Sequence, residues 1–92
     1  MTVKDIETER KRLIFRSWHR GTREMDLLLG SFADAHVPGF SAAELAQYEE
    51  ILNHSDPDLY DWISGRATVP ANYINKTLTI LLGFRLPASK KS

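Results

Sequence analysis

Apolar residues recur along the first half of the chain at helical spacing, three or four positions apart. The pattern predicts a first helix over about residues 3–19 and a second that ends near His36, before Pro38. A third helix is expected after Ser41, because Ser41 and Glu44 have the spacing of a capping box. The apolar positions of these three helices are Ile6, Leu13, Ile14, Trp18, Met25, Leu28, Leu29, Phe32, Leu45, Tyr48, Ile51 and Leu52.

The second half of the chain predicts two shorter helices. Asp56, followed by proline, is expected to cap a helix over about residues 57–64, and Gly65 to end it. A fifth helix is expected to open at Ala71 or Asn72, after a proline that blocks continuation. The apolar positions of these two helices are Leu59, Trp62, Ile63, Ile74, Leu78, Leu81 and Leu82. With no competing hairpin signal, the sequence predicts an all-α fold, a compact five-helix bundle.

The composition predicts one small domain. The 92 residues are 42% hydrophobic and 26% charged, and none is cysteine. A chain of this length buries only about 60% of its unfolded surface, so a large enclosed active site would compete with the core for residues. The lack of cysteine excludes disulfides, thiolate nucleophiles and cysteine-ligated metals. We expect a helical domain over residues 1–84 and a flexible C-terminal tail over residues 85–92.

Charge is distributed unevenly, although twelve basic residues balance twelve acidic ones. Seven basic residues lie between Lys4 and Arg23, whereas none lies between Glu24 and Gly65, a stretch with nine acidic residues. Such a dipolar layout can orient an encounter with another macromolecule, while the acidic stretch would repel nucleic acid. We therefore expect a protein partner rather than nucleic acid.

Motifs for catalysis, metal binding and membrane insertion are missing from the sequence. The three histidines are far apart, without a second ligand at metal-site spacing, so no metal site is predicted. There is no nucleophile elbow, dinucleotide fingerprint or phosphate loop, which predicts no catalytic residues and a protein that is not an enzyme. The longest apolar run, residues 78–84, is far shorter than the roughly 20 residues that span a bilayer, so no membrane insertion is expected.

The segment between the first two predicted helices is the strongest candidate for a functional site. Arg20 offers a planar fork of donors for a carboxylate or phosphate, and Gly21 would let another backbone approach closely. Glu24 lies one turn further along, and Arg16 and Arg23 would add a basic surround. The structural alternative is that Gly21 only closes one helix and caps the next, while Glu24 is a favourable first-turn acid.

Two segments together carry a resemblance to a known family. One reads Arg-Gly-x-x-Glu-x-Asp over residues 20–26, after a basic helix, and the other Asp-Pro-Asp-Leu-x-x-Trp over residues 56–62. In a chain of this length they resemble the small succinate dehydrogenase FAD-assembly factors, the flavinylation factor family, over about residues 8–84. His19 departs from the family, whose members often carry a second basic residue before the arginine, so the local charge here depends on pH.

The resemblance implies both a fold and a function. Family members are compact five-helix bundles that bind the flavoprotein subunit of succinate dehydrogenase, and in bacteria often that of fumarate reductase. They promote covalent attachment of FAD, which belongs to the partner, so this chain is expected to be a chaperone-like assembly factor that binds no FAD stably. We also expect a monomer. We expect it to act in the bacterial cytoplasm, because Met1 is present and no transit peptide is visible. The expected partner-binding residues are Arg16, His19, Arg20, Gly21, Arg23, Glu24 and Asp26.

A small helix-turn-helix-like nucleic-acid-binding domain is the alternative function. Residues 61–70 could form the turn, and the fifth helix would then enter the groove. The polar side chains that it offers to bases are Asn72, Asn75, Lys76 and Thr77. The neutral net charge weighs against this function.

Overall fold

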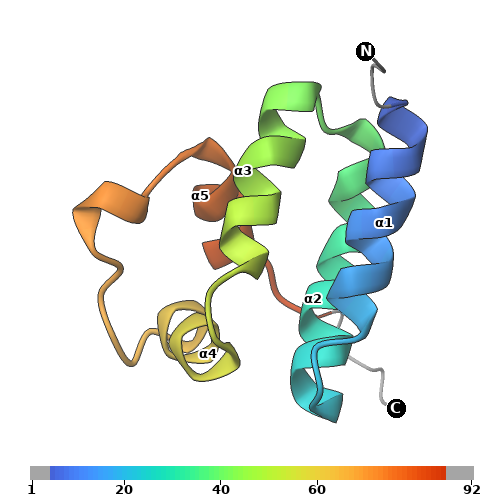
Figure 1. Cartoon of the computed structure of the whole chain (residues 1–92). Helices are drawn as coiled ribbons and strands as arrows, with labels where there is room; N and C mark the ends of the chain where they lie inside the picture. Colours follow the sequence, from blue (N-terminus) through green and yellow to red (C-terminus); the bar gives the residue numbers. More distant parts are fainter. Residues whose placement is uncertain (1–4, 87–92) are drawn as a thin grey trace.

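The chain folds into five α-helices and two short 3-10 turns, as a computed structural model shows for residues 5–86 (Figure 1). The elements in order are α1 (Ile6–Trp18), α2 (Arg23–His36), η1 (Val37–Gly39), α3 (Ala42–Leu52), α4 (Asp56–Ser64), η2 (Ala71–Tyr73) and α5 (Lys76–Leu82). No strand occurs in this part of the chain. The prediction of an all-α five-helix fold is confirmed.

The helices pack in two groups around α3. α1 and α2 form an antiparallel hairpin, and α3 packs on α1 from one side and on α5 from the other (Figure 1). α4 packs against α5, and the loop between α3 and α4 lies near the end of the α1–α2 hairpin, where Arg20 bonds to the Leu52 and His54 carbonyls. This arrangement brings the turn after α1 close to the start of α4, two segments that are 36 residues apart.

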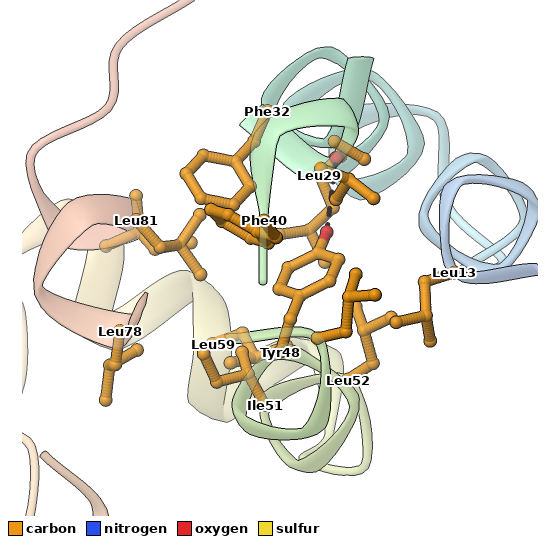
Figure 2. Packing of buried hydrophobic residues seen from close by; sticks show 14 of the residues in the cluster. Leu13, Leu29, Phe32, Phe40, Tyr48, Ile51, Leu52, Leu59, Leu78 and Leu81 are labelled. Atoms are coloured by element: carbon orange, nitrogen blue, oxygen red, sulfur yellow. Dashed lines mark hydrogen bonds between the residues drawn. The ribbon is translucent and has the colours of Figure 1, made fainter. Parts of the chain in front are cut away.

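Apolar side chains from all five α-helices and η1 fill a single core (Figure 2). Tyr48 is fully buried at its centre, with its hydroxyl 2.6 Å from Ser17 Oγ and 3.5 Å from the Leu29 carbonyl oxygen. Ser17 Oγ in turn donates to the Leu13 carbonyl at 2.8 Å, so the buried hydroxyls are satisfied. The buried residues labelled in Figure 2 are Leu13, Leu29, Phe32, Phe40, Tyr48, Ile51, Leu52, Leu59, Leu78 and Leu81.

Local sequence signals place most of the helix ends correctly. The capping box is present, since Ser41 Oγ accepts from the Glu44 N–H at 3.2 Å and Glu44 Oε1 accepts from the Ser41 N–H at 2.8 Å. α2 ends at His36 as predicted. Gly65 ends α4 with φ +83°, in the left-handed region that favours glycine.

Two predicted N-caps are wrong by one residue. Ser55, not Asp56, caps α4, because Ser55 Oγ accepts from the Asp58 N–H while the Asp56 carboxylate bonds to Arg20. Thr22, not Gly21, caps α2 by accepting from the N–H of the helix's third residue. In both cases the residue next to the predicted one caps the helix, and for α4 the predicted cap is instead engaged by a distant arginine.

The fifth helix begins later than predicted. Residues 71–73 form the turn η2, after which Ile74 is extended and Asn75 caps α5 by accepting from the Leu78 N–H at 2.8 Å. Ile74, expected on the inner face, therefore lies outside the helix and is 54% exposed. The later positions of the predicted stripe, Leu78 and Leu81, are buried.

The ends of the predicted domain fall partly outside the described residues. α1 begins at Ile6 and ends at Trp18, so the predicted start at residue 3 lies outside the described part of the chain. The tail predicted over residues 85–92 is described only at Arg85 and Leu86, which follow α5 in an irregular conformation. The domain boundary at residue 84 stays a prediction.

Candidate partner-binding site

The side chain of Arg20 faces its own chain. Arg20 Nε donates to Asp56 Oδ1 at 2.8 Å, in the first turn of α4. Its Nη1 donates to the Leu52 carbonyl at 2.6 Å, and its Nη2 to the His54 carbonyl at 2.8 Å. The side chain is only 10% exposed. Arg20 was expected to offer its guanidinium to a partner's acid or phosphate, but the structure directs three of its N–H donors to α4 and the end of α3.

The backbone of the same turn is held by Asp26. Asp26 Oδ1 accepts from the Arg20 N–H at 2.6 Å and from the Gly21 N–H at 3.2 Å. Gly21 has φ +121°, a conformation that side-chain-bearing residues rarely adopt, and a Cβ built there meets nothing within 4 Å. Asp26, predicted to bind a partner, therefore fixes the turn, and Gly21 leaves the space beside the turn open.

Arg23 and Glu24 supply the free charges of the site. Both side chains are exposed in the first turn of α2, and neither makes a hydrogen bond or ion pair within residues 5–86. Glu24 borders a groove of about 360 Å³ between α2, α4 and the segment after α5, whose walls include Leu28 and Tyr60. A second, more open hollow shares Leu27 with this groove and is bordered by Gly21 and Arg23. The two predicted charges are thus available to a partner.

Arg16, the part of the predicted basic surround that lies on α1, is already paired within the chain, as is the neighbouring Arg12. Arg16 Nη2 donates to Asn53 Oδ1 at 3.2 Å, and its Nη1 lies 3.8 Å from Glu49 Oε2. Arg12 bridges Glu9 and the same Glu49, and the hydrogen bonds to these two carboxylates raise the pKa of Arg12. The contacts with Glu49 and Asn53 join α1 to the α3 end of the fold, and together with the pair to Glu9 they leave less unpaired positive charge than the sequence suggested.

His19 lies beside the turn in an exposed aromatic pair that the sequence analysis missed. Its ring stacks on Phe15 with centroids 3.9 Å apart, and its Nδ1 lies 2.7 Å from the Phe15 carbonyl oxygen. Phe15 is 63% exposed, the highest value among the large apolar side chains described. The i, i+4 spacing of the two residues on an otherwise charged helix face was the available signal.

The candidate site contains no metal-binding cluster. No group of three or more His, Asp or Glu side chains within residues 5–86 is placed to hold a metal ion. Among the same residues, no helix is both long and apolar enough to span a membrane.

The residues proposed to read nucleic acid are occupied in the fold. Asn75 caps α5, Thr77 is buried and hydrogen-bonded to Gln47, and Lys76 Nζ lies 3.1 Å from Glu44 Oε2. α5 is also only seven residues long. Of the four expected readers, Asn72 alone stays without such a role, so the structure does not support the helix-turn-helix alternative.

Fold and site together define a small helical bundle that presents a turn held by hydrogen bonds, with an open glycine and two unpaired charges among the described residues. A sequence model of the family described as "flavinator of succinate dehydrogenase" matches residues 11–85. The chain belongs to this family.

Several characterised proteins are similar to the chain. It is 37% identical over 79 residues to succinate dehydrogenase assembly factor 2, mitochondrial, of Dictyostelium discoideum, a match that covers 86% of this chain and 56% of that protein. It is 44% identical over 66 residues to the FAD assembly factor SdhE of Acetobacter pasteurianus, a match that covers 72% of this chain and 61% of that protein. It is 37% identical over 78 residues to succinate dehydrogenase assembly factor 2-A, mitochondrial, of Drosophila yakuba, a match that covers 83% of this chain and 48% of that protein. The chain therefore spans about half to three fifths of each relative's length.

Proposed function

We propose that the chain is an assembly factor that binds the flavoprotein subunit of succinate dehydrogenase and promotes covalent attachment of FAD to it. The observation that carries this proposal is the family match over residues 11–85, together with relatives whose names state FAD or succinate dehydrogenase assembly. The attachment reaction takes place within the flavoprotein in this proposal. The chain acts as a chaperone that holds its client in a competent conformation and is not itself the catalyst.

The contact surface in this proposal is the exposed edge of the turn between α1 and α2. Gly21 permits close approach, Glu24 offers an unpaired carboxylate, and Arg23 offers an unpaired guanidinium. His19 and Arg16 flank this edge, with Arg16 shared between the partner and Asn53. Removing one partner of a charge pair that is desolvated in the complex, as proposed for Glu24, should cost more binding free energy than removing a charge at the rim.

FAD belongs to the partner in this proposal, and the chain binds none stably. The absorbance spectrum of the purified chain after mixing with FAD and gel filtration tests this point.

We further propose that the flavoprotein of fumarate reductase is a second client, that the chain works as a monomer, and that it acts in the bacterial cytoplasm. The 44% identity to a bacterial relative supports the bacterial setting, while the Dictyostelium and Drosophila relatives are mitochondrial by name.

Covalent flavin on the client is the direct test. Flavin fluorescence of the succinate dehydrogenase flavoprotein band is measured in denaturing gels, from cells with the gene, without it, and with Glu24→Ala. We expect loss of fluorescence without the gene and no repair by Glu24→Ala. Glu50→Ala is the matched control, since Glu50 is an exposed carboxylate on α3 rather than in the first turn of α2, and it should repair fully. Unchanged fluorescence in the strain without the gene would contradict the proposal.

A further inference from the structure

We propose that Arg20 serves partner binding as a positioning residue, and that Asp56 is the second half of the same device. In this inference Arg20 does not touch the partner. It ties the turn containing Gly21 to the junction between α3 and α4. The exposed edge of the turn therefore has one fixed orientation. The inference rests on the proposed function, because the orientation matters only if this edge meets a partner.

The Arg20 side chain binds three groups within residues 52–56, namely two backbone carbonyls and one carboxylate. Leu52 is the last residue of α3, where helix carbonyls lack partners within the helix, and His54 follows in the loop. Asp56 opens α4, where the helix dipole favours its negative charge. One guanidinium therefore satisfies one helix-end carbonyl, one loop carbonyl and one carboxylate, a fixed geometry that lysine's single ammonium cannot reproduce.

The bonds of Arg20 to Asp56 and to the two carbonyls, called the bridge from here on, are largely buried. Their loss should therefore destabilise the structure around them. The Arg20 and Asp56 side chains are 10% and 20% exposed. Removing either one leaves a charge, and in the case of Arg20 also two carbonyls, without its partner in a poorly hydrated place. The other charges of the α4 first turn do not share the task, since the exposed Asp58 makes no side-chain contact with Arg20.

The bridge controls the exposed edge because Arg20 is fixed at both ends. Its backbone N–H is held by Asp26 of α2, while its side chain is held by α3 and α4. Gly21 follows at once, and Glu24 lies in the first turn of α2. The orientation of the edge relative to α3 and α4 is therefore set through Arg20. This explains how the Arg-Gly-x-x-Glu and Asp-Pro-Asp-Leu segments act as one unit.

A double-mutant cycle on affinity for the purified flavoprotein subunit tests the inference. We expect Arg20→Ala and Asp56→Ala each to weaken binding by about tenfold or more, and the double variant to be no weaker than the worse single variant. Direct contact between Arg20 and the partner predicts the opposite for Asp56→Ala, namely unchanged or tighter binding, because the guanidinium would be released. Unchanged or tighter binding by Asp56→Ala would overturn the inference.

Controls separate positioning from a general loss of stability. Asp58→Ala removes a neighbouring α4 carboxylate, and Ile51→Val lowers stability in the core, and both should bind like the natural chain. Amide hydrogen exchange at Gly21 should speed up in the Arg20 and Asp56 variants and not in these controls. If Arg20→Ala fails to fold, Asp56→Asn, which keeps a neutral acceptor in place, should show a smaller loss than Asp56→Ala. Failure of the natural chain to bind would instead contradict the proposed function.

Discussion

The indole of Trp18 lies directly against the backbone of Gly30, one helix packed on the other without a side chain between them. A Cβ built on Gly30 would clash with three ring carbons of Trp18. The indole Nε1 also donates to Asp34 Oδ1, one turn further along α2, at 3.2 Å. Trp18 is half-buried, so it fixes the end of the α1–α2 hairpin from the edge of the core.

Replacing Gly30 with alanine should therefore destabilise the fold. The new methyl group would force the Trp18 indole away from α2. Overpacking of this kind lowers the free energy of unfolding by about 1–3 kcal/mol. Urea denaturation followed by circular dichroism measures the free energy of unfolding. Gly39→Ala is the control, because a Cβ there meets nothing within 4 Å, and it should change stability by less than about 0.5 kcal/mol. Equal effects of the two substitutions would refute the packing argument.

Local patterns in the sequence were sufficient to predict the helices, but not the contacts that place the site. The capping box and the apolar stripes depend on residues three or four positions apart, and they appear in the structure as predicted. The cap of α4 was misplaced because Ser55 and Asp56 are both good caps by sequence. The choice between them involves Arg20, which lies 36 residues earlier and engages Asp56.

The same limit applies to the candidate site, where some features follow from neighbouring residues in the sequence and others depend on residues far away in it. The exposed charges at Arg23 and Glu24 follow from their place in the first turn of an amphipathic helix. The inward direction of Arg20 does not, because its acceptors come from α3, the following loop and α4. Likewise, nothing near Gly30 in the sequence indicates that Trp18 lies against it.

Tyr48 should make stability fall in alkaline solution. Burial raises the pKa of Tyr48 to about 12 from its ordinary value of 10.0. Above about pH 10 the unfolded chain releases this proton while the folded chain retains it, so the free energy of unfolding decreases as pH rises. The decrease from this one group approaches roughly 1.4 kcal/mol per pH unit and ends near the folded pKa.

Tyr48→Phe separates this effect from other alkaline titrations. The free energy of unfolding of the variant should be about 1 kcal/mol lower near neutral pH, because the hydrogen bond between Tyr48 and Ser17 is lost. Ser17 keeps its hydrogen bond to the Leu13 carbonyl. Its stability should then decline less steeply than that of the natural chain above about pH 10. Melting temperatures over this range provide the measurement. Parallel curves for the two proteins would contradict the assignment to Tyr48.

Glu44 should contribute to stability at neutral pH and lose that contribution in acid. The hydrogen bond from the Ser41 backbone and the neighbouring Lys76 ammonium lower the pKa of Glu44 below 4.5. A lowered folded-state pKa gives stability that is present above the unfolded value and is lost as pH falls through the folded one. Carboxyl chemical shifts should show a midpoint below 4.5 in the natural chain. Lys76→Met should move this midpoint upward, and an unchanged midpoint would exclude Lys76 as a cause.

Gly21 should be required for the shape of the turn as well as for access to it. Its φ of +121° makes Gly21→Ala strained by about 1–3 kcal/mol even though a Cβ there meets nothing. Gly65→Ala is the matched control, because Gly65 also has a positive φ with open space around its Cβ, at the end of α4. Both variants should lose comparable stability in denaturation, but only the Gly21 variant should also lose affinity for the flavoprotein subunit. Equal affinities of two equally destabilised variants would show that Gly21 serves only the fold, and the contact surface would then have to be sought away from this turn.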